Sequence, residues 1–199
     1  MKYLFIVLVV FSLNLTKAER NDLSKKIRIS SKVTFGKGTI VSNIGIGVFS
    51  AYKTPKSIIL IPPVYTTLEF GLTDRIGLGL LAGYHATQYK EESNIYTVEQ
   101  NFSHIILQAR VAYHLIHRDK IDFYIGISAG YTFMTLNDKS VAKIPGATVA
   151  FPTPEKLQTP FAPGIYAGIR YYLTNQVAIF GEAGYSIAFI SGGICYRFQ

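Results

Sequence analysis

At 199 residues the chain is long enough for one domain, built around a packed core or as a closed barrel. Only 16% of its residues are charged, well short of the ~25% usual in soluble domains, while glycine (17) and tyrosine (14) are plentiful and tryptophan is absent. This balance favours turn-rich all-β structure. The single cysteine, Cys195, excludes an internal disulfide and a cysteine-based metal site. Much of the net charge of +8 lies near the N-terminus, where contact with lipid headgroups is expected rather than nucleic-acid binding.

Residues 1–18 have the layout of a secretory signal peptide. Lys2 is followed by an apolar run from Tyr3 to Leu13, and Thr16 and Ala18 are small residues at the positions that a cleavage site requires. The run is shorter than the ~20 residues of a membrane-spanning helix. We therefore expect export with cleavage after about Ala18; an uncleaved N-terminal anchor is the alternative.

Apolar residues recur with a period of two in eight segments, which predicts eight β-strands. In chain order the segments are residues 39–50, 64–73, 76–88, 104–115, 121–133, 165–173, 177–187 and 193–198. Most of them are longer than the ~5–6 residues of a typical soluble strand. They match the ~9–11 residues of a tilted strand that crosses a membrane.

The connections alternate between short and long. "TDR", "HRDK" and "TNQ" are short, whereas Tyr52–Pro63, Lys90–Gln100 and Asn137–Pro160 are longer and polar or Pro-rich. Short turns at one end and long loops at the other are the layout of an outer-membrane barrel. Two adjacent prolines do not fit inside a closed ladder, so we expect the membrane portion of the second strand to begin near Val64.

The two faces of the strands differ in a way that favours lipid outside the barrel. A soluble barrel such as a lipocalin would have its polar face in water, but here the more polar face is mostly Gly, Ala, Ser, Thr and Tyr. The other face is apolar and nearly free of charge, as lipid requires. Two aromatic girdles are predicted, one of Tyr84, Tyr131, Phe133 and Tyr185 and the other of Tyr113, Phe123, Tyr171, Tyr196 and Phe198.

The inward face carries three acids and three bases, which predicts a charge network across the lumen. They are Glu69, Arg110, Asp122, Arg170, Glu182 and Arg197. Pairing about the "LTNQ" turn places Arg170 within two residues of the position opposite Glu182, so we expect a diagonal contact between them. His114 is expected to face Asp122 across the preceding turn. The interior of such a barrel holds only side chains, so an open pore is not expected.

Three stretches together resemble the small outer-membrane β-barrel proteins of Gram-negative bacteria. They are "PPVYTTLEFGLTDRIGLG", "AYHLIHRDKIDFYIGISAGY" and "GIYAGIRYYLTNQVAIFGEAGYSIAFISGGICYRF". The chain is most similar to the porin-like barrels common in Bacteroidetes and, in plan, to OmpX and the OmpA membrane domain. The resemblance implies an all-β, eight-stranded antiparallel transmembrane β-barrel in the outer membrane, monomeric and without enzymatic activity, cofactor or metal.

The chain is expected to divide into three parts: residues 1–18 as the signal peptide, residues 19–37 as a periplasmic segment, and residues 38–199 as the barrel domain. The resemblance covers the last of these parts. The ending "YRFQ" resembles the C-terminal signal read by the barrel-assembly machinery, with Tyr196 and Phe198 as its aromatic residues and Gln199 as a departure from it. Whether residues 27–35 or 141–151 form further strands is left open.

Function is expected in the loops. The histidines (His85, His104, His114 and His117) are interpreted as lumen or rim residues because they lack metal-ligand spacing. The 137–160 loop contains "VAKIPGATVAF", which is able to extend two strands into a protruding hairpin for a surface partner. The leading hypothesis is a barrel that stabilises the outer membrane or presents loops for adhesion. A narrow channel for small solutes is the alternative, and a lipid-modifying enzyme is a distant third.

Overall fold

A computed structural model describes residues 34–51, 56–118, 120–143 and 161–198, although not the side chains of residues 117 and 118. The predicted signal peptide and most of the predicted periplasmic segment lie outside these residues, as does most of the expected 141–151 hairpin. None of the described residues belongs to a helix that is long and apolar enough to span a membrane.

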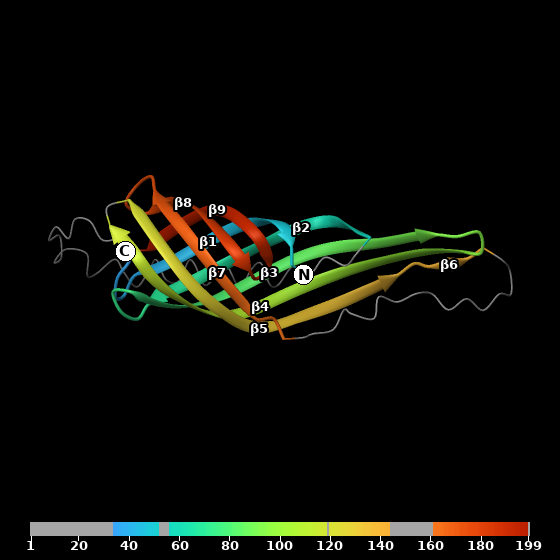
Figure 1. The fold of residues 1–199 in the computed structure, drawn as a ribbon, viewed down its shortest axis with the longest axis horizontal. Helices are drawn as coiled ribbons and strands as arrows, with labels where there is room; N and C mark the ends of the chain where they lie inside the picture. Colours follow the sequence, from blue (N-terminus) through green and yellow to red (C-terminus); the bar gives the residue numbers. More distant parts are fainter. Residues whose placement is uncertain (1–33, 52–55, 119, 144–160, 199) are drawn as a thin grey trace, which may run out of the picture. The chain divides into compact units, whose positions relative to one another are not determined.

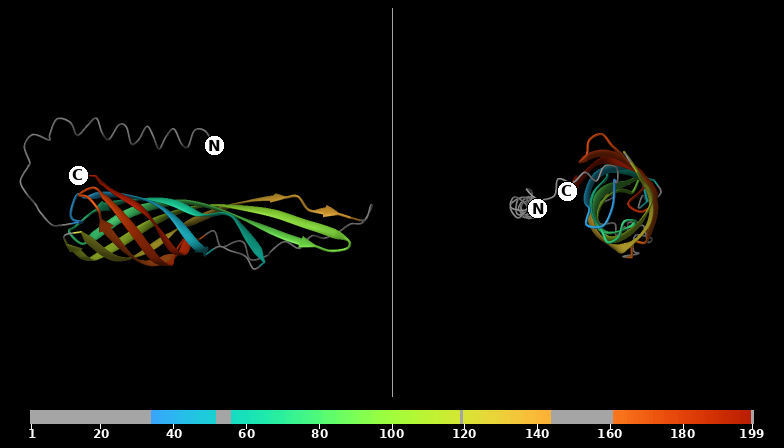
Figure 2. Two further views of the ribbon diagram at one scale, coloured as in Figure 1. Left: turned by 90° about the horizontal axis from the view of Figure 1, so that it is seen from above. Right: turned by 90° about the vertical axis from the view of Figure 1, so that its left-hand side faces the viewer.

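Eight antiparallel strands close into a barrel, which confirms the predicted fold (Figures 1 and 2). They are β1 (Ile40–Ser50), β2 (Ser57–Gly71), β3 (Ile76–Glu92), β4 (Tyr96–Arg118), β5 (Ile121–Asp138), β7 (Gly164–Tyr172), β8 (Val177–Tyr185) and β9 (Ala188–Phe198). The neighbours run in the order β3-β2-β1-β9-β8-β7-β5-β4, and pairing of β3 with β4 completes the ring. The first and last strands therefore lie side by side.

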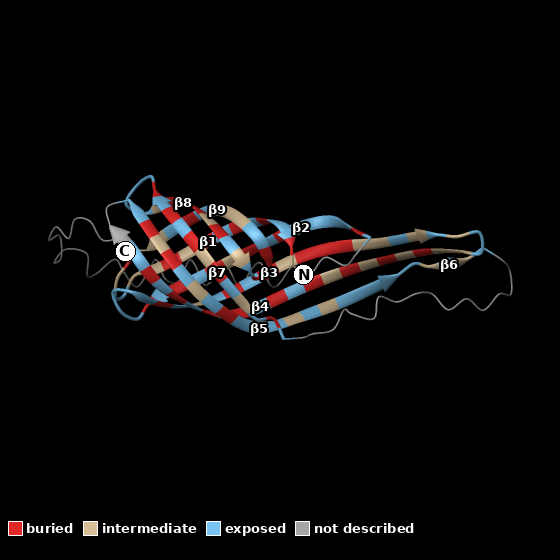
Figure 3. Cartoon of the chain, in the orientation of Figure 1, coloured by how far each residue is buried: buried red, intermediate tan, exposed pale blue. Residues whose placement is uncertain are grey.

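The period-two pattern separates an apolar outer face from a polar, buried inner face. Ile44, Leu80 and Ile165 are each more than 60% exposed on the outside. Asn43, Thr67 and many other polar side chains are buried inside, so exposed and buried residues alternate along each strand (Figure 3). A water-soluble monomer rarely exposes so much contiguous apolar surface. The barrel is therefore of the transmembrane type, with lipid as the solvent of its outer face.

Pro62 and Pro63 lie in the part of β2 that is not paired with β1. Pairing of β1 with β2 ends at Ile46 opposite Val64, and farther out β2 pairs with β3 alone, with shifted register on either side of Ile61. Proline lacks the N–H that an inner strand needs, and an edge tolerates it. Val64 thus begins the doubly paired part of β2, while the start of its membrane portion there stays a prediction. The strand itself starts earlier, at Ser57, so the predicted loop Tyr52–Pro63 was too long.

The predicted loop Lys90–Gln100 was wrong. The β3–β4 ladder continues to Glu92 opposite Thr97, and only residues 93–95 connect the two strands. β5 extends to Asp138, and the two-residue β6 (Val141–Ala142) pairs with the start of β4. In Figure 1 the ribbons of β3, β4 and β5 run on well past the ends of the other strands. We call this part, Tyr84–Ser103 with Tyr131–Ala142, the protruding sheet.

Candidate functional site

The lumen is the place where the polar side chains converge, and the strand register positions them. Glu69 on β2, Arg110 on β4 and Glu182 on β8 point inward because they share a face with buried neighbours. Small residues make the necessary room: a Cβ on Gly77 would lie 2.0 Å from the Glu69 Oε1 atom. A Cβ on Gly168 would lie 2.4 Å from the Tyr124 ring.

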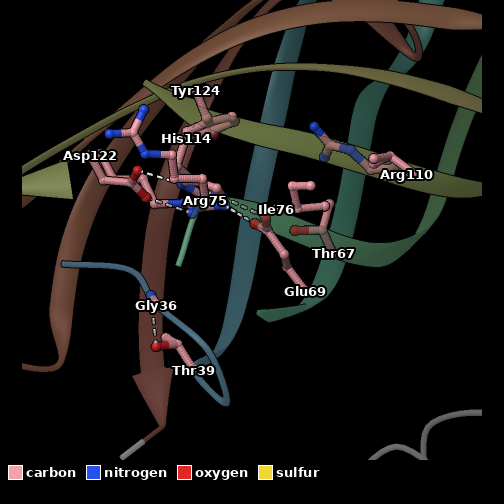
Figure 4. A network of polar contacts seen from close by, with 12 residues as sticks. Gly36, Thr39, Thr67, Glu69, Arg75, Ile76, Arg110, His114, Asp122 and Tyr124 are labelled. Carbon is pink, nitrogen blue, oxygen red and sulfur yellow. Dashed lines mark hydrogen bonds and ion pairs between the residues drawn. The ribbon is translucent and has the colours of Figure 1, made fainter. Parts of the chain in front are cut away.

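Four charged or titratable side chains form a closed cluster near the short-turn end of the lumen. The Arg170 guanidinium bridges two acids, with its Nη2 atom 2.5 Å from Glu69 Oε2 and its Nη1 atom 2.8 Å from Asp122 Oδ2. His114 joins the same two acids on its other side: Nδ1 lies 2.6 Å from Asp122 Oδ1 and Nε2 lies 2.9 Å from Glu69 Oε1. Figure 4 shows His114 between Glu69 and Asp122. We call these four residues the lower cluster.

A second cluster lies beside the first. Arg110 Nη2 is 2.8 Å from Glu182 Oε1, and the Tyr124 hydroxyl donates to the same oxygen over 2.8 Å. The Arg110 guanidinium lies 3.8 Å from the centroid of the Tyr166 ring. The Arg170 guanidinium lies 4.3 Å from the Tyr124 ring centroid, so Tyr124 links the two clusters. Buried charges are tolerated in a protein interior only when paired in this manner.

The sequence-predicted network is thus brought together with different partners. Glu182 lies opposite Gly168, two residues from Arg170 as expected, but Arg170 binds Glu69 and Asp122 instead of Glu182. The expected contact of His114 with Asp122 is present. Arg197 lies apart from both clusters, at the mouth of the barrel, where its side chain donates to the carbonyls of Thr34 and Asn175.

The segment Thr34–Thr39, here called the strap, crosses the short-turn mouth of the barrel. Gly38 N donates to Gly71 O and Gly71 N donates to Thr39 O, each over 2.8 Å. The Thr34 hydroxyl donates to the Ile121 carbonyl, and Phe35 is 1% exposed inside the lumen. Residues 19–37 were expected to be a periplasmic segment, and the contacts of Thr34 and Phe35 with the barrel were not predicted. A lone aromatic in "KVTFGKG" was the only signal.

Polar contacts also continue from the long-loop end of the lumen into the base of the protruding sheet. His85 and His104 lie opposite each other on β3 and β4, and their rings stack with centroids 4.3 Å apart. The Gln108 Oε1 atom accepts hydrogen bonds from Ser186 and Ser128, while its amide nitrogen donates to the Ala162 carbonyl. Among the described residues no group of three or more His, Cys, Asp and Glu side chains is arranged to hold a metal ion.

Free space beside the charges is very small. The internal cavity between Glu69, Arg110 and Tyr166 has a volume of about 10 Å³, the space of about one water molecule. The Cys195 thiol is buried as well. Tyr196 and Phe198 of the predicted assembly signal lie on β9 at the short-turn end, with their rings 4.9 Å apart. Polar and aromatic side chains therefore occupy the lumen around the two charge clusters.

No protein-family model and no curated protein matches the chain. Among solved structures, the chain is similar to a de novo designed transmembrane β-barrel, with a TM-score of 0.46 and 14% identity over 81% of this chain and 97% of that one. It is similar to the outer membrane protein OprG of Pseudomonas aeruginosa, with a TM-score of 0.44 and 11% identity over 84% and 99% of the two chains. For the attachment invasion locus protein Ail of Yersinia pestis the TM-score is 0.39 and the identity 15% over 82% and 99%. All three TM-scores are below 0.5. The strand pairing and the apolar outer face of the chain itself show that it is an eight-stranded barrel of the transmembrane type.

Proposed function

We propose that the protein is a non-enzymatic barrel of the outer membrane of a Gram-negative bacterium. Its packed wall anchors the protruding sheet outside the membrane, where the sheet contacts a surface partner. The observation that carries this proposal is the unequal length of the strands. β7 pairs with β5 only as far as Ser128 opposite Gly164, whereas β5 stays paired with β4 as far as Asp138.

The protruding sheet has the composition of a contact surface. Ile95 and Val141 are exposed at its far end, near the charged residues Glu92 and Lys143, and Leu136 is exposed farther back, opposite Phe102. A polar sheet that had no partner would gain nothing from large apolar side chains in water, so their exposure favours an interaction surface. The Lys143–Glu92 ion pair and the β4–β6 pairing support the sheet along its edge.

The lumen supports a structural role for the barrel wall in preference to the alternative of a solute channel. The strap covers the short-turn mouth, and the two charge clusters occupy the cross-section above it. An aqueous path would need these buried pairs to separate, which is costly in a low-dielectric interior. In planar bilayers we therefore expect no discrete conductance steps from the wild-type chain.

The proposal is tested by shortening the sheet without touching the wall. Tyr89 lies opposite Gln100, so residues 90–99 are replaced by Asn-Gly, a dipeptide that forms a two-residue hairpin turn. We expect the variant to fold, which a difference in gel migration between unheated and heated samples would report. We expect it to lose binding of cells or isolated surface components. The matched control changes only the connecting residues 93–95 and leaves β3 and β4 at full length. Unchanged binding by the shortened variant would remove the adhesion proposal.

A further inference from the structure

An apolar groove of about 540 Å³ crosses the outer wall of the barrel. It runs over β4, β5, β7 and β8 and is lined by Val111, Tyr113, Ile125, Gly126, Ile127, Ile165, Tyr166, Ala167, Ala183 and Gly184. None of these residues is charged. The groove therefore lies on the face that the proposed function places against lipid, and the inference below rests on that placement.

The strand register explains the groove. Tyr113, Ile125, Ala167 and Ala183 lie opposite one another in a single row across four strands. The next row toward the long-loop end is Val111, Ile127, Ile165 and Tyr185, in which Ile165 and Tyr185 are larger than the two alanines beside them. Phe123 and Ile169 lie on the short-turn side of the row that contains the two alanines. Two alanines between rows that contain larger side chains thus leave a groove on the outer face.

The guanidinium of Arg75 lies at one end of this groove. The Arg75 Nη1 atom donates to the Tyr113 hydroxyl over 3.2 Å, and Arg75 is exposed in the short turn between β2 and β3. Tyr113 faces outward and lies opposite Ile76, the first residue of β3. The groove thus begins beside a guanidinium at the short-turn end of the barrel and climbs obliquely to β8, where Gly184 is near the opposite end of its strand.

We propose that the groove binds an anionic glycerophospholipid of the leaflet on the short-turn side. One acyl chain lies on Ala167 and Ala183, and the phosphate group pairs with Arg75. Three inter-strand steps of ~4.8 Å give the groove a length of about 14 Å. That length is close to one leaflet of a hydrocarbon core ~30 Å thick. Juxtamembrane cations attract anionic headgroups, and a guanidinium matches phosphate geometry.

Native mass spectrometry of the refolded full chain tests the proposal. The protein is titrated with phosphatidylglycerol and, separately, with phosphatidylcholine carrying the same acyl chains. We expect phosphatidylglycerol to bind more tightly, by roughly two- to fivefold, which is the size of effect that exposed charge pairs produce. Arg75→Gln is expected to remove this preference, and Ala167→Leu with Ala183→Leu to reduce the binding of both lipids by filling the groove.

Matched controls separate this site from general charge and packing. Ala129 also faces outward but lies outside the groove, so Ala129→Leu should leave lipid binding unchanged. Lys90→Gln removes a charge at the opposite end of β3 and should likewise have no effect. Equal binding of the two lipids, or binding that survives in the filled groove, overturns the proposal. So does a dimer that disappears with Ala183→Leu, because a second copy would then be the occupant.

Failure of this inference is distinguishable from failure of the proposed function. A chain that inserts into bilayers and migrates as a folded barrel but does not discriminate between lipids contradicts only the lipid site. A chain that does not insert at all contradicts the membrane barrel, and the lipid site with it.

Discussion

The ring of Phe35 stacks on the imidazole of His114, with ring centroids 3.4 Å apart and an angle of 7° between the planes. His114 in turn bridges Glu69 and Asp122. The strap and the lower cluster are therefore one packed unit: the aromatic ring covers the face of the imidazole whose nitrogen atoms hold the two carboxylates. A substitution in the strap should consequently change the packing around His114 inside the lumen.

Phe35→Ala is expected to destabilise the barrel by about 3–5 kcal/mol, since large-to-small changes of a fully buried aromatic residue lose burial and leave a cavity. Unfolding by guanidinium in detergent micelles measures the loss. The half-exposed Phe161 is the control, and Phe161→Ala should change stability by less than about 1 kcal/mol. Equal effects of the two substitutions would show that the strap does not close the mouth.

The ion-pair partners within the lumen are tested by double-mutant cycles. Arg170→Met alone leaves two buried carboxylates without their cation and should cost about 3–5 kcal/mol. Combined with Glu69→Gln, the loss should fall well short of the sum of the two single losses, because the residues are in contact. The comparison is Arg170→Met with Glu182→Gln, where we expect the smaller coupling. A larger coupling to Glu182 would favour the hairpin pairing that the sequence suggested.

A glycine in β7 tests the packing of the lumen. Gly168→Ala places a methyl group 2.4 Å from the Tyr124 ring, which is hemmed in by Glu182 and Arg170. We expect a loss of about 1–3 kcal/mol, the usual cost of overpacking a core. Gly181 of β8, which lies opposite Ile169, has open space at this position, with its nearest neighbour atom 3.9 Å away. Gly181→Ala should therefore be neutral within about 0.5 kcal/mol.

The ion pair at the edge of the protruding sheet gives a pH dependence. The hydrogen bond from Lys143 holds the pKa of the exposed Glu92 carboxyl below its usual value. Because the pKa is lowered in the folded protein, the pair stabilises β6 at neutral pH and is lost as the pH falls through that pKa. The reporter is hydrogen exchange of the Lys143 amide, which donates to the Ile95 carbonyl over 2.9 Å.

The Glu92→Gln variant supplies the reference, since it lacks the charge at every pH. We expect the wild-type amide to be the more protected at neutral pH and the two proteins to converge in acid. Identical protection at neutral pH would mean that the pairing with Tyr96 and Thr97, and not the ion pair, holds β6 in place.

The wall of the barrel could be predicted from the sequence because lipid imposes a strict period of two. Ile165, Ala167, Ile169 and Tyr171 stand at every second position and lie on the outer face of β7. Outside the lipid the outer face need not be apolar. The polar residues of Lys90–Gln100 therefore looked like a loop, although they continue the ladder of β3 and β4.

The partner of Arg170 could not be predicted in the same way. Glu69 and Arg170 are 101 residues apart and meet only across the closed lumen, whereas reasoning from a hairpin sees neighbouring strands alone. Phe35 is harder still. It belongs to no periodic segment, and its contact with His114 depends on the strap turning back over the mouth.

The pairing of Ile40 with Phe198 has a consequence for how the barrel forms. β1 has no partner on this side until β9, the last strand, has been made, so the seam of the ring joins residues up to 158 positions apart. Until that seam closes, two rows of backbone amide and carbonyl groups have no strand to pair with, which the hydrocarbon of a bilayer does not tolerate. Insertion and closure must therefore be nearly simultaneous.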